Sequence, residues 1–568
     1  MKLRTSYFNL TVLRKNITRF APLWILASVF QVLLLLMIVS RDPGRVANDL
    51  STIIGPMALY NVGYALLCAT CLFGDLYKSK MCNALHAMPM KREGWLLTNL
   101  ASGAIFALIP ATLGCLCGIA LTREFCQMAL LWQGASLLQF VVFFGMAVFC
   151  ALCAGTRLGA FGLYGVLNFS PLLLYVMSSY FYEPLLPSVR FDYEPILVAT
   201  PFLQLTLLDG YAFFEYGKIE SYFYGCSSQT WGYLWICVAL GVLLLAAAWL
   251  VYRRRHLERA GEFITVKPMR YVFVVAFTLG VATFLHAIFD LFVGSGNYLF
   301  FAIGAVIGYF GGVMLLERSV KVFRGKVLIG FAAVCIAFLA SCGVVAADPL
   351  GLTTYVPEAE KVEKAYVFLG YSGFGTPTFE DKTWGDTAEE IAAVVDIHKD
   401  LVENKETDMV GDNIQSKVVY LMKDGSTVER FYWAEPKGAA GQKIKAYFSD
   451  YRNLFEVDCW EELEARLVSV EACSYIDQAK YVNIRDNIRN EELLEALRKD
   501  CEAGLLVQDS NYYMQPEVYG VTVLLDVPDT RIMGRTNTRV IHLNIYSGCV
   551  NTIGYLNSIQ WPETDLIY

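Results

Sequence analysis

The hydropathy pattern of the first 350 or so residues is dominated by long apolar runs separated by short charged segments. About nine of these runs approach the roughly 20 residues that an α-helix needs to cross a bilayer. They fall at residues 20–40, 52–74, 95–121, 129–154, 158–181, 230–252, 271–293, 297–317 and 327–347. The pattern predicts a polytopic α-helical membrane protein with about nine spans.

After residue 348 the pattern becomes that of a water-soluble domain. Residues 389–404 repeat apolar side chains close to helical spacing, which predicts an amphipathic helix. Residues 417–422 and 427–433 flank Asp424-Gly425, a pair that accepts the positive φ angles of a tight turn, so they predict a β-hairpin. Further helices are expected at 442–455 and 490–503, and further strands at 521–527 and 539–546. Residues 348–568 are therefore expected to form an α+β domain, with helices packed on a sheet.

The charges divide at the same boundary. Residues 348–568 contain 38 acidic and 21 basic residues, whereas the preceding part contains 15 acidic and 25 basic ones. If the N-terminus is cytoplasmic, the inner loops hold about 20 Lys and Arg against about 5 in the outer loops, as the positive-inside rule requires. An odd number of spans then makes residues 348–568 an extracytoplasmic domain of a multi-pass plasma-membrane protein. Loss of one span, at the short link after the fourth or the seventh, would leave that domain in the cytoplasm.

The segment 1–19 is both basic and amphipathic. Leu3, Tyr7, Leu10, Leu13 and Ile17 recur at helical spacing between Lys and Arg residues. This predicts a helix that lies on the inner membrane surface in contact with lipid. A disordered, positively charged leader is the alternative. The apolar run that follows is too long for a signal peptide and has no clear cleavage site, so we expect it to stay as the first span.

The loop between the second and third spans has the clearest functional pattern. Helix-forming residues from Leu76 to His86 precede Pro89 and the basic pair Lys91-Arg92. The order predicts a short helix at 76–86 parallel to the membrane, followed by a turn into the next span. An ordinary positive-inside loop is the simpler interpretation.

With this loop, the chain resembles the permease subunits of ABC-type exporters with the type-2, ABCG-like membrane fold, and among them the Gram-positive type with a C-terminal extracytoplasmic domain. Those permeases have an interfacial N-terminal helix and a coupling helix in the first cytoplasmic loop, which docks on a separate ATPase. The resemblance covers roughly the first 260 residues, including the run Arg253 to His256 after the sixth span. Leu85 to Arg92 is similar to the family's closing pattern, although Met88 stands where leucine is usual.

The resemblance implies an order of parts along the chain. Residues 1–19 would be the interfacial helix, 20–260 a six-span permease core, 261–347 three additional spans and 348–568 the outer domain. The implied ATPase-coupling residues are Leu76, Tyr77, Lys78, Met81, Leu85, Pro89, Lys91 and Arg92.

A long outer segment between the fifth and sixth spans is rich in aromatic residues, which suit the membrane interface. Its apolar stretch, 195–208, is too short to span easily. We expect a re-entrant or interfacial helix near 195–215, and ABCG-like permeases have such helices at this place.

No nucleotide-binding or catalytic motif is found in the sequence. The segment Gly438 to Lys443 lacks the Ser or Thr that follows the lysine of a phosphate-binding loop. The histidines of the outer domain, His398 and His542, are far apart and sit in no metal or nucleophile motif, so we interpret them as surface or hydrogen-bonded core groups. The chain is therefore not expected to be an enzyme. ATP and magnesium would bind to the partner ATPase, and this chain would need no cofactor.

Two further groups of side chains leave alternatives open. His286 and Asp290 share one face of the seventh span, where helix packing near the outer surface is favoured over a proton relay. Cys459, Cys473, Cys501 and Cys549 permit two disulfides in three pairings, or remain as buried thiols.

Taken with the resemblance, these patterns predict the permease subunit of an ATP-driven exporter of an amphipathic molecule. Its expected partners are an ABC ATPase, itself or a related permease, and membrane lipid, with no nucleic acid. The substrate, the direction of transport, the choice between homodimer and heterodimer and the ligand of the outer domain stay open. The alternative is a membrane-anchored sensor or binding protein that uses residues 348–568 to detect a ligand.

Overall fold

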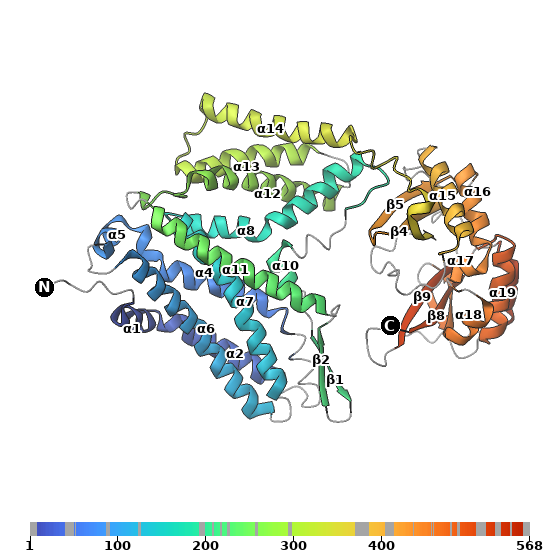
Figure 1. The fold of residues 1–568 in the computed structure, drawn as a ribbon, viewed down its shortest axis with the longest axis horizontal. Helices are drawn as coiled ribbons and strands as arrows, with labels where there is room; N and C mark the ends of the chain where they lie inside the picture. Colours follow the sequence, from blue (N-terminus) through green and yellow to red (C-terminus); the bar gives the residue numbers. More distant parts are fainter. Residues whose placement is uncertain are drawn as a thin grey trace. The chain divides into compact units, whose positions relative to one another are not determined.

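The protein divides into two compact units. The structure, a computed structural model, describes residues 8–39, 50, 53–86, 91–122, 126–191, 199–206, 210–215, 218–223, 228–255, 259–293, 298–369, 385–403, 414–435, 437–455, 457, 459–477, 480–484, 489–506, 519–528, 536–545 and 548–559. The helical unit comprises Met1–Ser178 and Asp192–Leu339, and the α/β unit comprises Ser179–Phe191 and Ala340–Tyr568. Figure 1 labels the elements of both units.

The helical unit is built from long apolar helices. In chain order its helices are α1 (Leu10–Arg19), α2 (Ala21–Val39), α4 (Met57–Leu72), α5 (Ser79–His86), α6 (Arg92–Thr122), α7 (Cys126–Cys153), α8 (Arg157–Met177), α10 (Pro201–Thr206), α11 (Ser228–Arg254), α12 (Lys267–Val293), α13 (Leu299–Glu317) and α14 (Gly325–Ala346), whose last turns belong to the α/β unit. Among the described residues, eight helices are long and apolar enough to cross a membrane: α2, α6, α7, α8, α11, α12, α13 and α14. This agrees with the expected polytopic helical membrane protein.

The second expected span, 52–74, is shorter than the sequence predicts. Its helix α4 has 16 residues, which at 1.5 Å per residue is about 24 Å, less than the roughly 30 Å of a hydrocarbon core. The next residues fold into a 3₁₀-helix, Gly74–Tyr77, rather than continuing the helix. Asn61, Tyr64 and Cys68 of α4 are buried against neighbouring helices. A helix too short to cross the hydrocarbon core by itself is tolerated where other parts of the protein surround it.

Helix α7 forms the centre of the helical unit. It is the most deeply buried of the eight long helices and packs against α4, α6, α8 and α11. Gly145 of α7 lies directly against Gly241 of α11, so that a Cβ atom on Gly145 would come within 2.2 Å of the Gly241 carbonyl oxygen. Small residues let membrane helices approach to backbone contact, where van der Waals packing is strongest.

The α/β unit contains two antiparallel sheets rather than the single sheet expected. The first has the order β3 (Val362–Leu369), β4 (Ile414–Met422), β5 (Thr427–Ala434). The second has the order β7 (Lys480–Ile484), β6 (Leu467–Asp477), β8 (Tyr519–Pro528), β9 (Thr536–Ile545). The helices are α15 (Ala388–Glu403), α16 (Ala439–Phe448), α17 (Tyr451–Phe455), α18 (Trp460–Arg466), α19 (Asn490–Glu502) and α20 (Val550–Ser558). Strand β6 was not predicted because Ser469, Ala472 and Ser474 give it weak strand propensity, and pairing with β8 decides its conformation.

The predicted hairpin is confirmed as β4 and β5. Gly425 adopts a φ of +83°, and the Asp424 carboxylate accepts a hydrogen bond from the Ser426 amide at 2.9 Å. These are the features for which Asp-Gly is favoured in tight turns.

Two expected helices of the α/β unit, 389–404 and 490–503, are confirmed as α15 and α19. The helix expected at 442–455 is broken into α16 and α17. At the break, the Asp450 carboxylate accepts from the Arg452 amide at 3.0 Å, a local bond that competes with helix continuation.

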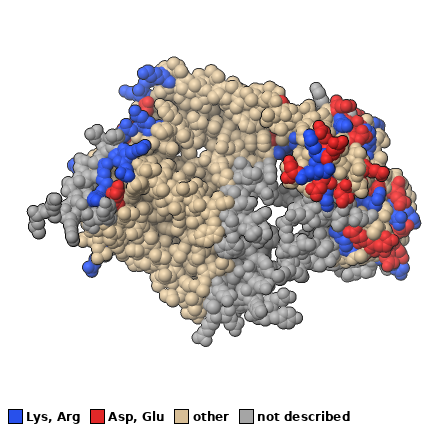
Figure 2. Space-filling model, in the orientation of Figure 1, with Lys and Arg blue, Asp and Glu red and all other residues tan. Residues whose placement is uncertain are grey.

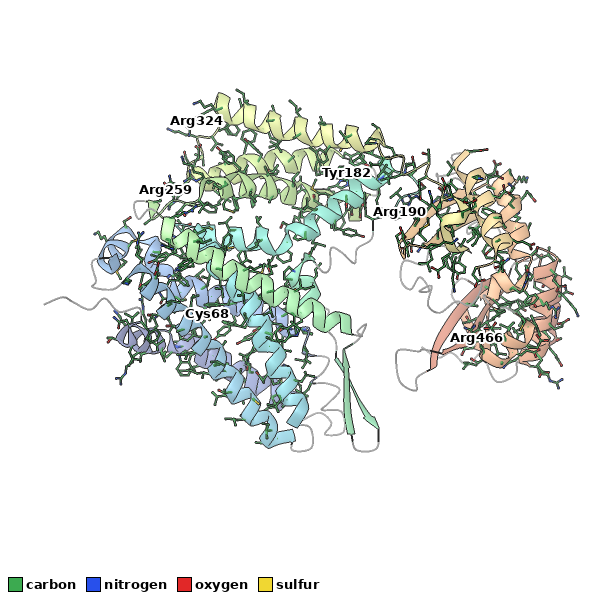
Figure 3. All side chains as sticks on the ribbon, in the orientation of Figure 1. Cys68, Tyr182, Arg190, Arg259, Arg324 and Arg466 are labelled. Carbon is green, nitrogen blue, oxygen red and sulfur yellow. The ribbon has the colours of Figure 1, made fainter. Side chains whose placement is uncertain are left out.

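A segment distant in sequence completes the α/β unit. Residues Ser179–Phe191 follow α8 directly but belong to the same compact unit as residues after Ala340. The Phe431 amide of β5 donates to the Ser188 carbonyl at 2.9 Å, and the Tyr182 hydroxyl lies 2.9 Å from the Ser341 hydroxyl. Figure 3 labels Tyr182 and Arg190 of this segment. The α/β unit is thus joined to the helical unit through both α8 and α14.

Candidate functional site

The basic segments that the sequence places on the inner side gather at one end of the helical unit. Figure 2 shows Lys and Arg concentrated there, and Figure 3 labels Arg259 and Arg324 at this end. Contacts join segments far apart in sequence: Arg19 pairs with Asp75 at 3.3 Å, and Arg318 donates to the Gly261 carbonyl at 3.0 Å. We call this surface the basic end.

The short helix expected at 76–86 lies at the basic end and is divided into two pieces. Residues Gly74–Tyr77 form a 3₁₀-helix, Lys78 is extended, and α5 begins at Ser79. Leu76 is fully buried, whereas the Met81 side chain is 40% exposed and Lys78 and Lys80 are also exposed. The loop thus has one side against the bundle and one side directed outward.

The structure describes only some of the remaining residues expected to couple to an ATPase. Lys91 is exposed and Arg92, at the start of α6, is partly buried. Pro89 and the side chain of Leu85 lie outside the described residues.

Arg255, directly after α11, anchors the loop on the side that faces the helix bundle. Its guanidinium donates to the Leu152 carbonyl at 2.8 Å and to the Leu76 carbonyl at 3.4 Å. Burial lowers the pKa of Arg255. Arg92 donates in turn to the Arg255 carbonyl at 3.5 Å. One buried cation therefore links the loop to the ends of α6, α7 and α11 that lie at the basic end.

Aromatic packing supports the same joint. The Trp95 ring lies 5.5 Å from Phe73 in an edge-on arrangement and 5.7 Å from Tyr252. Tyr77 donates to the Ala151 carbonyl at 3.4 Å, and burial raises the pKa of the Tyr77 hydroxyl. The rings come from the ends of α4, α6 and α11, so a displacement of the loop is opposed by close packing.

Neither Arg255 nor Trp95 was predicted to be an anchor. In the sequence, Arg253 to His256 form the basic exit of the sixth expected span, and Trp95 begins the third. The sequence does contain a signal for Arg255. Successive residues at the end of a helix point in different directions, so one arginine of a basic run after an apolar helix faces the bundle.

Helix α1 is attached to α6 by polar contacts. Asn16 donates to Asn99 at 2.7 Å and to Ser102 at 3.0 Å, and all three are buried. The Leu10 side chain is 70% exposed. A helix that buries its polar residue in protein and leaves an apolar residue outside suits the expected interfacial position. Leu3 and Tyr7 lie outside the described residues.

The pair His286 and Asp290 lies on α12. The His286 ring stacks on Tyr298 at 5.6 Å and packs edge-on against Phe301 at 6.5 Å, both beside α13. These ring contacts fit the helix-packing interpretation.

Neutral amides, which were not predicted to have a role, form a polar network inside the bundle. Asn61 of α4 donates to Ser136 and Gln139 of α7 at 3.1 and 3.0 Å. Gln139 donates to the Ile54 carbonyl at 2.8 Å and to the Leu205 carbonyl at 3.5 Å. The network connects α4 and α7 to α10. Interhelical hydrogen bonds of this kind stabilise membrane bundles by about 0.6 kcal/mol each.

The outer segment expected to hold a helix near 195–215 is only partly helical. Helix α10 covers Pro201–Thr206, while Gly210–Glu215 and Lys218–Phe223 form the antiparallel hairpin β1–β2. Aromatic and β-branched residues such as Tyr211, Phe213 and Ile219 favour strands, which the re-entrant interpretation overlooked.

In the α/β unit His398 is a core residue, as interpreted from the sequence. It is fully buried and lies 3.0 Å from the Tyr420 hydroxyl and 2.8 Å from the Tyr432 hydroxyl. Burial, with a smaller effect of Arg430, lowers the pKa of His398 to about 3. The side chain of His542 lies outside the described residues.

Of the four cysteines considered for disulfides, the three whose side chains the structure describes, Cys459, Cys501 and Cys549, are free thiols. Cys501 donates to the Phe448 carbonyl at 3.1 Å, and burial raises the pKa of its thiol to about 12. The side chain of Cys473 lies outside the described residues. The buried-thiol alternative therefore fits Cys501.

Within the described parts of the chain, no group of three or more His, Cys, Asp or Glu side chains is arranged to hold a metal ion. No protein-family model, curated protein or solved structure matches this chain. The arrangement of the basic end is accordingly the main guide to function.

Proposed function

We propose that this chain is the membrane subunit, or permease, of an ABC-type transporter that works with a separate ATPase subunit. One observation carries the proposal: α5 has an exposed side at the basic end, while Arg255 and Trp95 hold Leu76 and Phe73, just before it in the chain, against the ends of three long helices. A docking helix that is exposed to a partner and rigidly attached to the bundle can transmit a partner's movement.

In this proposal ATP and magnesium bind to the ATPase, whose closure displaces α5. Arg255 passes the displacement from the Leu76 carbonyl to the Leu152 carbonyl of α7. Trp95 passes it to α6. This chain itself would bind no nucleotide.

The cargo and the direction of transport in the proposal come from the family resemblance alone. That resemblance suggests export of an amphipathic molecule by two permeases, either two copies of this chain or this chain and a related one. Membrane lipid would surround the long helices.

We further propose that the basic end is cytoplasmic and the α/β unit extracytoplasmic, in the plasma membrane. Helix α8 supports this topology. It starts at the basic end, where the Gly155 amide beside it donates to the Phe263 carbonyl at 3.4 Å, and its far end continues into Ser179–Phe191 of the α/β unit. The four long helices α11 to α14 lie between the two segments of the α/β unit, and an even number of crossings returns the chain to the same side.

The test is purification of the full chain from its native membrane in mild detergent, with identification of the proteins that accompany it. Lys80→Glu reverses a charge on the exposed side of α5. Lys326→Glu makes the same change at the start of α14, also at the basic end, and serves as the matched control.

We expect an ATPase with Walker motifs to accompany the wild type and the Lys326→Glu variant, and to be reduced about tenfold with Lys80→Glu, because interface charge reversals typically cost 1 kcal/mol or more. Isolation of the wild-type chain without any ATPase, in repeated preparations, would count against a permease.

A specific observation also favours the sensor alternative. The α/β unit includes the continuation of α8 as well as that of α14, so a ligand that changes this unit can act on two long helices. Protection of the α/β unit from protease by a component of the growth medium, in a chain that purifies alone, would support the sensor and not the permease.

A further inference from the structure

A second site lies at the basic end, between the end of α11 and the start of α12. It is a cavity of about 360 Å³, within the roughly 300–1,000 Å³ typical of small-molecule sites. Four cationic side chains line it: Arg254, Arg255, Arg259 and Lys267. Nothing in the proposed coupling to an ATPase requires this cavity.

Two of the four cations, Arg255 and Arg259, are held in place by hydrogen bonds, and Arg254 and Lys267 are exposed. Arg255 is buried and held by the Leu152 carbonyl. Arg259 donates one N–H group to the Thr265 carbonyl at 2.7 Å, which holds its guanidinium in place. A guanidinium has five N–H groups in all, so it can bind a ligand as well. The nearby acid Glu262 is paired with Arg270. Two fixed and two exposed cations around a partly apolar cavity attract an anion.

The start of α12 contributes one of the four cations, Lys267. Thr265, Val266 and Lys267, which lead into and begin α12, line the cavity. The Thr265 amide donates to the Cys153 carbonyl at 2.8 Å and Pro268 has no N–H group, so the positive charge of the cavity comes from its side chains.

The rest of the lining is apolar and opens toward lipid. Leu250 and Val251 of α11 line the cavity, and Leu250 is half exposed on the surface of a membrane-spanning helix. The site therefore combines a cationic part at the end of the helices with an apolar part along one of them, which matches a phosphate group attached to acyl chains and not a free soluble anion.

We propose that this cavity binds the headgroup phosphate of an anionic phospholipid, with Arg254, Arg259 and Lys267 as the cationic contacts and Leu250 and Val251 against the glycerol and upper acyl region. Because Arg255 lines the same cavity and donates to the Leu76 carbonyl, an occupied site stiffens the attachment of α5. This consequence rests on the proposed function, whereas lipid binding does not.

The experiment measures lipid retained by the full-length protein. The protein is equilibrated in mixed micelles that contain equal amounts of phosphatidylglycerol and phosphatidylcholine, washed in lipid-free detergent and extracted, and each lipid is quantified by mass spectrometry. A parallel sample contains inorganic phosphate at millimolar concentration as a competitor.

Two double variants remove the same number of exposed cations from the basic end. Arg254→Gln with Lys267→Gln alters the cavity, and Lys321→Gln with Lys326→Gln alters the segment between α13 and α14. The charge-conserving pair Arg254→Lys with Lys267→Arg, and the thermal unfolding of every variant, separate a lost site from a misfolded protein.

We expect the wild type to retain phosphatidylglycerol in preference to phosphatidylcholine. Its retention should fall about tenfold in the cavity variant and stay unchanged in the other double variant, since each Lys or Arg near an anionic membrane contributes strongly to lipid binding. Equal retention of the two lipids, or equal loss in both double variants, would overturn the proposal. Displacement of phosphatidylglycerol by inorganic phosphate would assign the site to a soluble anion instead.

Discussion

At the scale of single residues, the surroundings of a side chain decide its role more than its type does. Two histidines and one arginine illustrate this: His398 is a neutral core group, His286 packs against rings, and Arg255 is a buried anchor. None of these roles follows from the residue type alone.

His398 makes the α/β unit sensitive to acid. Its pKa is lowered to about 3 in the folded chain, against about 6.5 when unfolded. Between these values the unfolded state binds more protons, so the free energy of unfolding is at its full value above pH 6.5 and falls as the pH drops toward 3. We expect protease resistance of the α/β unit in the full-length protein to decrease from pH 7 to pH 5. The decrease should be smaller in His398→Gln, which does not titrate; identical pH profiles would contradict this account.

Arg255→Lys should loosen the attachment of α5. Lysine keeps the charge but cannot reach the Leu76 and Leu152 carbonyls together as the guanidinium fork does. Loss of a charged hydrogen bond costs about 2 kcal/mol. Cys82 of α5 is buried, so we expect its alkylation, followed by peptide mass spectrometry, to become about tenfold faster. Arg254→Lys, one position earlier and exposed, is the control and should leave the rate unchanged.

At the scale of elements, the close crossing of α7 and α11 depends on glycine. Gly145→Ala would force a methyl group onto the Gly241 carbonyl. Overpacking of this kind costs about 1–3 kcal/mol, and we expect a lower thermal unfolding temperature in detergent. Gly134→Ala on the same helix meets nothing within 4 Å and should leave the unfolding temperature equal or slightly higher, because alanine favours helix. Equal effects of the two changes would show that the crossing is not tight.

Helices α15 and α19 and the hairpin of the α/β unit were predictable because each is specified by local residues. Residues 388–403 repeat apolar positions at helical spacing, and Asp424-Gly425 specifies the turn between β4 and β5. Strands β6 and β3 were not predicted, since their pairing with β8 and β4 joins residues far apart in sequence. The division into two sheets follows from that pairing.

At the scale of the whole molecule, the α/β unit and the basic end lie at opposite ends of α8 in the proposed topology. Protease added to right-side-out membrane vesicles is expected to cut the α/β unit and remove a C-terminal epitope tag, while an N-terminal tag stays protected. Protection of the C-terminal tag together with loss of the N-terminal one would invert the topology. Protection of both tags would place the basic end and the α/β unit together in the cytoplasm.

The sequence by itself determined the features that depend on composition and short-range spacing. These are the long apolar helices, the separation of basic and acidic charge, the helix after Lys78 and the hairpin at Gly425. Each arises from transfer of apolar residues out of water or from local backbone geometry, which neighbouring residues specify.

Only the tertiary structure decided which distant residues meet. It joined Arg255 to Leu76, Asn16 to Asn99 and Phe431 to Ser188, contacts that span 83 residues or more. It also buried the short helix α4 and gathered four cations around one cavity. Such contacts depend on how helices pack against one another, and a single sequence carries no local signal for packing partners.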